Sequence, residues 1–158
     1  MGVKNLEKVL TNYNTICVDT MVFIYLLEQN SKYIDLAALV LGAIESGKVK
    51  GVTSTITIAE ILTAPAQISD TQAMLDYELF LTNFPNLTIY TLDESMARLI
   101  AKIRASTRLK LPDAIQIATA IHADADVIVS NDKKWKNRFT TPKLFLLEEY
   151  LPHSNESK

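Results

Sequence analysis

The sequence predicts an α/β protein in which a central parallel β-sheet is covered by helices on both faces. Short apolar runs alternate with longer amphipathic runs along most of the chain. The 158 residues suit a single domain, and 48% of them are hydrophobic, which is enough for a sizeable core without disulfides. No internal repeat or low-complexity segment interrupts this alternation.

Five apolar runs have the length of buried strands, and six longer runs have the length of helices. The strands are expected at 15–18, 49–54, 87–92, 126–130 and 143–147. The helices are expected at 20–29, 31–48, 55–64, 69–84, 93–107 and 111–123. The helix at 93–107 begins with acids and has basic residues toward its end, as the helix dipole favours. Strands and helices thus alternate, which is typical of a parallel sheet.

Local signals predict several helix ends. Ser31 is the expected N-cap of the second helix, and Gly47 is its expected C-terminal stop. Pro65 is expected to end the third helix, because proline disrupts the bonding of a helix interior. Ser69 and Gln72 fit a capping box at the start of the fourth helix.

The expected domain covers residues 14–150. Residues 1–13 are interpreted as an N-terminal extension, and residues 151–158 as a flexible tail. The single cysteine, Cys17, excludes an internal disulfide and is expected to be a small buried side chain. We expect a cytoplasmic protein, because no signal peptide or membrane-spanning run is visible.

Composition and motifs exclude several function classes. The formal net charge of −2 provides no global attraction to nucleic acid. The segment "GAIESGKV" (42–49) almost fits a phosphate-binding loop. It ends in Val49 rather than a hydroxyl residue, and it runs from a helix into a strand. With only His122 and His153, the chain has little from which to build a zinc site or a Ser-His-Asp triad.

Four acids stand where a parallel sheet can bring side chains together. Asp19 and Asp132 directly follow expected strands, and Asp113 lies in the first turn of a helix behind Pro112. Glu60 lies inside a helix on an otherwise apolar face, where capping cannot explain it. Each acid also has an ordinary interpretation, as a helix cap, a dipole partner or an exposed charge.

Four neighbouring carboxylates without matched cations would repel one another and raise their pKa values. A hard divalent cation resolves the conflict, because Mg²⁺ and Mn²⁺ prefer oxygen ligands. One or two such ions polarise a phosphoryl group and help to generate an attacking hydroxide. The sequence therefore predicts a magnesium or manganese site.

The segments "ICVDTMVFIYLLE", "TSTITIAEIL", "LPDAIQIATA" and "VIVSND" resemble, in order and spacing, the four acidic motifs of PIN-domain ribonucleases. The VapC toxins of type II toxin–antitoxin pairs are the most similar group. The resemblance covers roughly residues 14–147. It implies a PIN-like, Rossmann-like three-layer α/β/α sandwich and metal-dependent cleavage of RNA. The catalytic and metal-binding acids would be Asp19, Glu60, Asp113 and Asp132.

The same resemblance implies supporting roles for Thr20, Ser130 and Asn131, which would hold the ligands or bound waters. A cognate antitoxin and a homodimer are typical of that group. About fourteen residues precede the first strand, where small toxins of this type begin within a few.

Basic residues flank the acids and are expected to bind RNA phosphates. These residues are Arg108, Lys110, Lys133 and Lys134. A solvated helix face is the ordinary alternative. Trp135 is expected to pack at a helix edge, and stacking on a base is the alternative.

Other functions remain open or are excluded by particular residues. A phosphatase of the haloacid dehalogenase type would need Asp-x-Asp after the first strand, and here Met21 occupies the second acidic position. A receiver domain would need an acidic pair before the first acid. A non-catalytic PIN-fold binding or regulatory module and a nuclease acting on DNA both remain possible.

Overall fold

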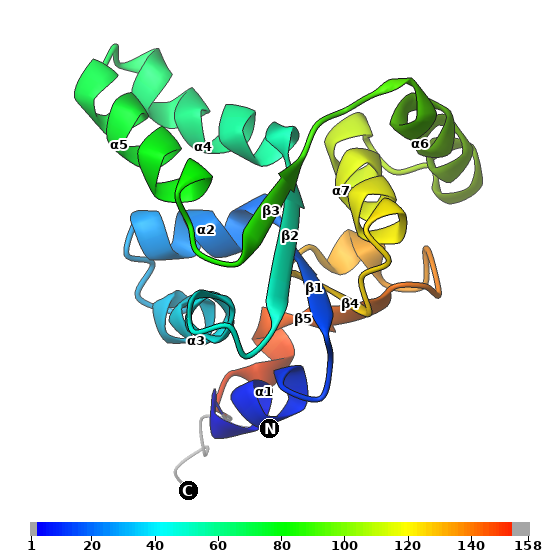
Figure 1. Cartoon of the computed structure of the whole chain (residues 1–158), viewed down its shortest axis with the longest axis horizontal. Coiled ribbons are helices and arrows are strands. Elements are labelled where there is room, and N and C mark those ends of the chain that lie inside the picture. The colour runs from blue at the N-terminus through cyan, green and yellow to red at the C-terminus, as the bar shows by residue number, and fades with distance from the viewer. Residues whose placement is uncertain (1–2, 153–158) are drawn as a thin grey trace, which may run out of the picture.

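The computed structural model describes residues 3–152 (Figure 1). Its strands are β1 (Thr15–Val18), β2 (Lys50–Ser54), β3 (Leu87–Tyr90), β4 (Val127–Ser130) and β5 (Lys143–Leu146). Its α-helices are α1 (Val3–Leu10), α2 (Thr20–Leu27), α3 (Ile34–Glu45), α4 (Thr55–Gln67), α5 (Thr71–Thr82), α6 (Glu94–Thr107) and α7 (Leu111–His122). Two short 3₁₀ helices follow β4 and β5, η1 (Lys133–Trp135) and η2 (Leu147–Tyr150).

All strand pairs are parallel, in the order β3-β2-β1-β4-β5. The expected parallel sheet is confirmed, and each expected strand agrees with an observed one to within two residues. The central strand β1 lies between β2 and β4, which belong to the two halves of the sheet. Ligands of such sheets bind at the carboxyl ends of the strands, where the strand order reverses.

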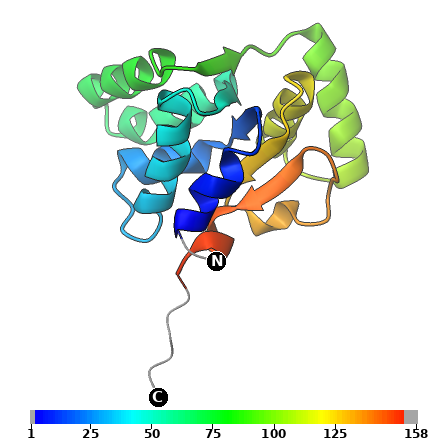
Figure 2. The same ribbon diagram turned by 60° about the horizontal axis from the view of Figure 1, so that its bottom comes forward.

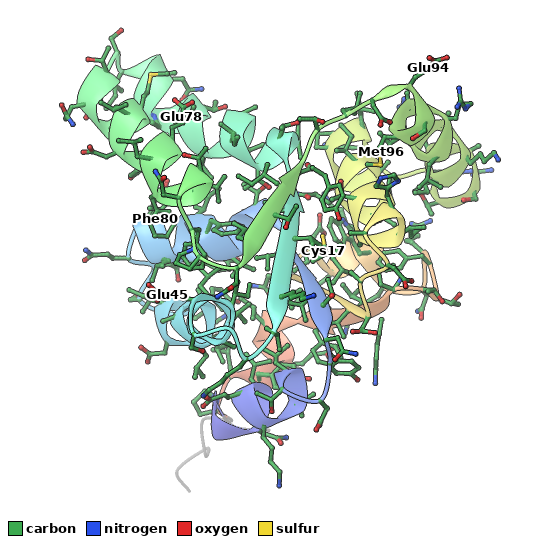
Figure 3. All side chains as sticks on the ribbon, in the orientation of Figure 1. Cys17, Glu45, Glu78, Phe80, Glu94 and Met96 are labelled. Atoms are coloured by element: carbon green, nitrogen blue, oxygen red, sulfur yellow. The ribbon has the colours of Figure 1, made fainter. Side chains whose placement is uncertain are left out.

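The sheet separates two apolar cores, so the molecule has three layers (Figures 1 and 2). Residues from α1, α2, α3 and η2 pack on one face, together with residues from the neighbouring helices α4 and α5. Residues from α6 and α7 pack on the other. Figure 3 labels Phe80 on the α5 side of the sheet, with Cys17 and Met96 on the opposite side. Cys17 is buried, as the sequence predicts.

The N-terminal segment contains a helix that was not predicted from the sequence. Helix α1 packs beside α3 and near η2 (Figure 2). Its Leu6 and Leu10 are fully buried in the same core as the strands. The expected tail at 151–158 lies mostly outside the described residues.

The expected start of the second helix was wrong. Ser31 does not cap it, because the side chain of Asn30 accepts hydrogen bonds from the backbone N–H groups of Lys32 and Tyr33. These bonds form a turn before α3, which begins at Ile34. The expected stop at Gly47 is confirmed, with a φ of 75° just beyond the helix.

The expected junction between the third and fourth helices was also wrong. Pro65 lies inside α4, which continues to Gln67, because a proline this close to a helix end disturbs only the last turns. Ser69 has a φ of 56° and belongs to the connecting turn. The cap of α5 is Asp70, whose carboxylate accepts a hydrogen bond from the N–H of Ala73 at 3.0 Å.

Within residues 3–152, no helix combines the length and the apolar character that crossing a membrane requires.

Candidate active site

Asp19 stands where β1 ends and α2 begins. Its backbone N–H donates to Val129 on β4, so the pairing of the two central strands continues to this residue. One carboxylate oxygen accepts the N–H of Thr20 at 2.8 Å, which makes Asp19 the N-cap of α2. The other accepts the hydroxyl of Ser130 at 2.6 Å. The expected capping role is therefore present, and only 8% of the residue is exposed.

The environment of Asp19 disfavours its ionised form. Burial raises the pKa of this carboxyl to about 7, and repulsion from Glu60 and Asp113 adds to the effect. The hydrogen bonds from Ser130 and Thr20 act in the opposite direction without compensating. Asp19 thus lies close to two other acids, and no cationic side chain in the described part of the protein is bonded to it.

The side chain of Glu60 extends from α4 toward Asp19. Its Oε1 accepts a hydrogen bond of 3.2 Å from the hydroxyl of Thr20. Partial burial raises the pKa of Glu60, and repulsion from Asp113 raises it further. Although the residue is exposed overall, its carboxyl is tied to the residue that follows Asp19. This contact argues against the interpretation of Glu60 as a free surface charge.

Asp113 occupies the first turn of α7 and is partly buried. Burial raises the pKa of Asp113 and repulsion from Asp132 adds to it, while the Trp135 indole and Lys134 lower it. The indole N–H is buried and faces Asp113 without a hydrogen bond of good geometry to any described residue. Trp135 is 1% exposed and packs edge-on against Phe139, so its packing role is confirmed and base stacking is excluded.

Asp132 lies just past β4 and caps η1. Its carboxylate accepts the N–H of Lys134 at 2.8 Å. Its own N–H donates to the hydroxyl of Ser130 at 3.1 Å. Ser130 therefore joins the backbone of Asp132 to the carboxyl of Asp19, across the ends of two neighbouring strands.

The structure thus brings the four predicted acids to one edge of the sheet. Repulsion links Asp19, Glu60 and Asp113 to one another, and Asp113 to Asp132. In donor type, a group of carboxylates with hydroxyls beside it fits a hard divalent cation. As placed, however, no three His, Cys, Asp or Glu side chains in the described part of the chain could hold one ion. Ligation by this set therefore needs side-chain rotation or bridging water.

The three expected supporting residues differ in position. Thr20 and Ser130 contact the acids, as described above. Asn131 points elsewhere: its amide N–H donates to the hydroxyl of Tyr25 at 3.0 Å, and its amide oxygen accepts the N–H of Glu148 at 3.0 Å. Asn131 therefore connects the end of β4 to α2 and η2 rather than to the carboxyl groups.

The four expected phosphate-binding residues are all exposed. Lys134 lies close enough to Asp113 to lower the pKa of that carboxyl. Lys133 instead forms a 2.6 Å ion pair with Glu148. Arg108 ends α6 with a φ of 58°, and Lys110 precedes the first turn of α7. Lys134 and Lys110 are thus better placed near the acids than Lys133.

Two buried polar residues near the acids were missed in the sequence. Thr57 lies three residues before Glu60, and Gln116 lies three residues after Asp113. Both side chains are hydrogen-bonded to one another beneath the carboxyl groups. The available signal was a polar residue one helical turn from an acid within an apolar run.

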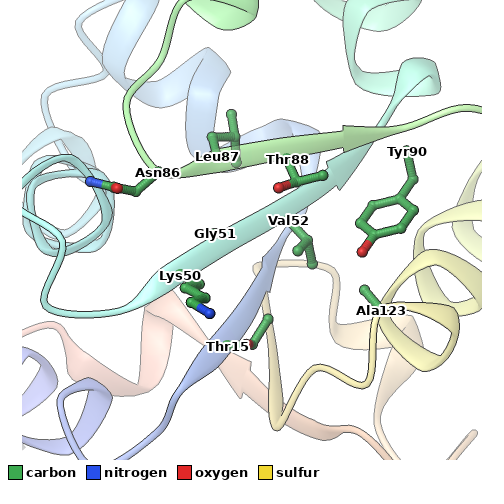
Figure 4. A pocket seen from close by; sticks show the side chains of 9 residues that line it. All are labelled: Thr15, Lys50, Gly51, Val52, Asn86, Leu87, Thr88, Tyr90 and Ala123. Atoms are coloured by element: carbon green, nitrogen blue, oxygen red, sulfur yellow. The ribbon is translucent and has the colours of Figure 1, made fainter.

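A hollow of about 500 Å³ lies away from the acids (Figure 4). It is lined by Thr15 and Lys50 at the starts of β1 and β2, and by Tyr90 and Ala123. The hollow follows β2 and β3, and none of the four acids lines it, so it is separate from their site.

Several solved structures share this fold. In a toxin–antitoxin complex from Klebsiella pneumoniae, the matching chain is 21% identical, with a TM-score of 0.60. The match covers 82% of this chain and 99% of that one. FitAcB from Neisseria gonorrhoeae contains a chain that is 20% identical, with a TM-score of 0.63 and coverage of 84% and 98%.

VapBC2 from Rickettsia felis, bound to a DNA fragment from its promoter, gives 16% identity, a TM-score of 0.62 and coverage of 84% and 98%. At these identities the likenesses show a shared fold. No match was found among curated proteins. The family model of the PIN domain matches residues 16–138, which include all four acids. This chain belongs to the PIN domain family.

Proposed function

We propose that this protein is a metal-dependent endoribonuclease and the toxin of a toxin–antitoxin pair. The observation that carries the proposal is the meeting of four carboxyl groups at the carboxyl ends of β1 and β4, with the pKa values of three of them raised. Membership of the PIN domain family supports nuclease chemistry. The toxin–antitoxin complex from Klebsiella pneumoniae, which has this fold, supports the biological role.

Asp19, Glu60 and Asp113 would hold a Mg²⁺ or Mn²⁺ ion, directly or through water, and Asp132 would complete the cluster. When bound, such an ion lowers the pKa of water and offsets charge on a phosphodiester. Its charge would also relieve the repulsion that raises the pKa values of the acids.

The chain's own residues hold this site in place. Ser130 fixes one oxygen of Asp19, and the N–H of Thr20 fixes the other. No histidine is needed as a nucleophile or base. His122 ends α7, at the opposite end of that helix from Asp113.

The substrate would be held by its phosphates. Lys134, Lys110 and Arg108 are exposed, on segments next to Asp113 and Asp132. A local group of cations can bind phosphates even though the formal net charge of the chain is −2. Lys133 would contribute less, because Glu148 already neutralises it.

The proposed protein acts in the cytoplasm on an RNA substrate. Its proposed partners are a cognate antitoxin and a second copy of the chain. A non-catalytic binding module is the second candidate. It is favoured by one observation, namely that no three acids among residues 3–152 form a ready-made ion site.

The test compares cleavage of single-stranded RNA and single-stranded DNA of matched sequence, in Mg²⁺, Mn²⁺ or EDTA. The proposal expects cleavage of the RNA in either metal and none in EDTA. Preferential cleavage of the DNA would replace the substrate class. No cleavage in any condition, together with no rise of Tm on adding metal, would favour the binding module.

A further inference from the structure

Three threonines and one glutamine form a buried chain of hydrogen bonds beneath the carboxyl groups. Gln116 donates from Nε2 to the hydroxyl of Thr57 at 2.7 Å and to that of Thr20 at 3.2 Å. The hydroxyl of Thr57 also lies 2.8 Å from that of Thr53 and 3.1 Å from that of Thr20. None of the four residues is more than 2% exposed. This hydrogen-bond network joins α2, α4 and α7. Asp19 caps α2, Glu60 lies on α4, and Asp113 lies in the first turn of α7.

The hydroxyl protons give this chain a direction, because each threonine has one proton to donate. The proton of Thr53 goes to a backbone carbonyl of β1 at 2.9 Å. The proton of Thr57 therefore goes to Thr53, and one of the two lone pairs of Thr57 accepts from Gln116. The proton of Thr20 is then left for Oε1 of Glu60, at 3.2 Å.

The carbonyl end of the Gln116 amide is not satisfied in this way. Its Oε1 is buried and has no hydrogen-bond partner among residues 3–152. Burying an unpaired carbonyl oxygen is unfavourable, and an apolar side chain at this position would avoid it. The amide is therefore useful at this position for its two donors.

We propose that Gln116 is a positioning residue for the acidic site, acting through Thr20. By donating to the hydroxyl oxygens of both Thr57 and Thr20, it occupies one lone pair on each and directs the Thr20 proton to Glu60, which holds the Glu60 carboxyl toward the other acids. Without the amide, both lone pairs of the Thr57 hydroxyl are vacant 3.1 Å from Thr20, so Thr57 competes more strongly with Glu60 for that proton. This inference rests on the proposed nuclease function.

The test is a double-mutant cycle of Gln116→Met and Thr20→Val, with Thr119→Val as the matched control. Thr119 is also a buried residue of α7, but among the described residues its hydroxyl bonds only to the carbonyl of Ile115 in its own helix. Each variant is assayed for kcat and KM on RNA and for Mn²⁺ affinity by calorimetry, well below its Tm.

Residues that orient metal ligands typically contribute about 10-fold or more to affinity or activity. We expect Gln116→Met to lower kcat and Mn²⁺ affinity by about that factor, with KM almost unchanged. The double variant should be no worse than Thr20→Val, because the two side chains act in series. Thr119→Val should behave as wild type. Additive losses in the double variant, or wild-type behaviour of Gln116→Met, would overturn the inference.

A second measurement separates this inference from the proposed function. In wild type, the side-chain amide protons of Gln116 should exchange with deuterated solvent much more slowly than those of exposed Gln67, as seen by NMR. Equally fast exchange would overturn the hydrogen-bonded chain, whatever the activity. If the wild type binds no Mn²⁺ and cuts no RNA, the proposed function is overturned instead. Slow exchange of the Gln116 amide protons would still support the buried hydrogen-bond network in that case.

Discussion

The hydroxyl of Ser130 donates a 2.6 Å hydrogen bond to the carboxyl of Asp19, and it links the ends of two adjacent parallel strands. The bond lowers the pKa of Asp19 against the larger, opposing effect of burial. Ser130 also accepts the backbone N–H of Asp132, so one hydroxyl orients two of the four acidic residues.

Replacing this hydroxyl should therefore raise the pKa of Asp19 above about 7. We expect Ser130→Ala to show this in a carboxyl ¹³C NMR titration, and to lose about 10-fold or more in RNA cleavage. Ser46→Ala is the control, because within residues 3–152 that hydroxyl bonds only to the nearby carbonyl of Ala43. An unchanged Asp19 titration in Ser130→Ala would contradict the role given to Ser130.

The raised pKa of Asp19 predicts how the metal-free protein responds to pH. Between the ordinary carboxyl pKa of 3.8 and about 7, the folded state holds a proton that the unfolded state releases. This contribution to stability is complete at low pH and is lost as the pH rises through that window. Asp93 and Glu148, whose pKa values are lowered by hydrogen bonds, act in the opposite sense at more acidic pH.

We expect the Tm of the protein in EDTA to fall between pH 5 and pH 7 by more in wild type than in Asp19→Asn. A tenfold change in a proton-binding constant corresponds to about 1.4 kcal/mol, so the contrast between the two proteins should be measurable by scanning calorimetry. Added Mn²⁺ should raise the Tm of wild type more at pH 7 than at pH 5. Identical slopes for the two proteins would show that Asp19 is not desolvated.

Helix α1 should contribute to the stability of the whole domain. Leu6 is fully buried against the main core, so Leu6→Ala should lower the free energy of unfolding by about 2–5 kcal/mol. Lys8→Ala, on the exposed side of the same helix, should change it little. Chemical denaturation compares the two variants. Equal stability of Leu6→Ala and wild type would mean that α1 is detached in solution.

The two neighbouring lysines of η1 should differ in RNA binding. Lys134 lies near Asp113, whereas Lys133 is paired with Glu148. We expect Lys134→Ala to weaken RNA binding. The slope of log K against log salt concentration should also fall by about one, which corresponds to the loss of one phosphate contact. Lys133→Ala should have a smaller effect. Filter binding in EDTA at several salt concentrations measures both, and the reverse order would contradict the proposed path of the substrate.

Much of the fold could be predicted from the sequence, because the strands are short apolar runs separated by helical ones. "TICV" is a strand with the expected bounds. The ends of helices were harder, because several residues compete to cap them. Asn30 and Asp70 determined two starts that had been assigned to Ser31 and Ser69. Helix α1 was missed although its apolar residues lie on one helix face, with Leu6 and Leu10 one turn apart, because residues 1–13 were interpreted as an extension outside the domain.

The candidate site shows the same division. The positions of Asp19 and Asp132 follow from strand ends, and the acids were therefore predictable. The direction of a side chain was not: Asn131 directly follows Ser130 and yet bonds to Tyr25 and Glu148. Lys133 likewise looked like a phosphate ligand until Glu148, fifteen residues away in sequence, supplied its partner.

The most direct measurement of the central claim is metal-dependent cleavage of single-stranded RNA by Asp113→Asn and Asp124→Asn beside wild type. Both substitutions remove one acid near an end of α7, but Asp124 is exposed and lies beyond the end of the helix remote from the other acids. The account predicts that Asp113→Asn stays folded and loses cleavage, while Asp124→Asn cuts as wild type does. Full cleavage by Asp113→Asn would contradict it.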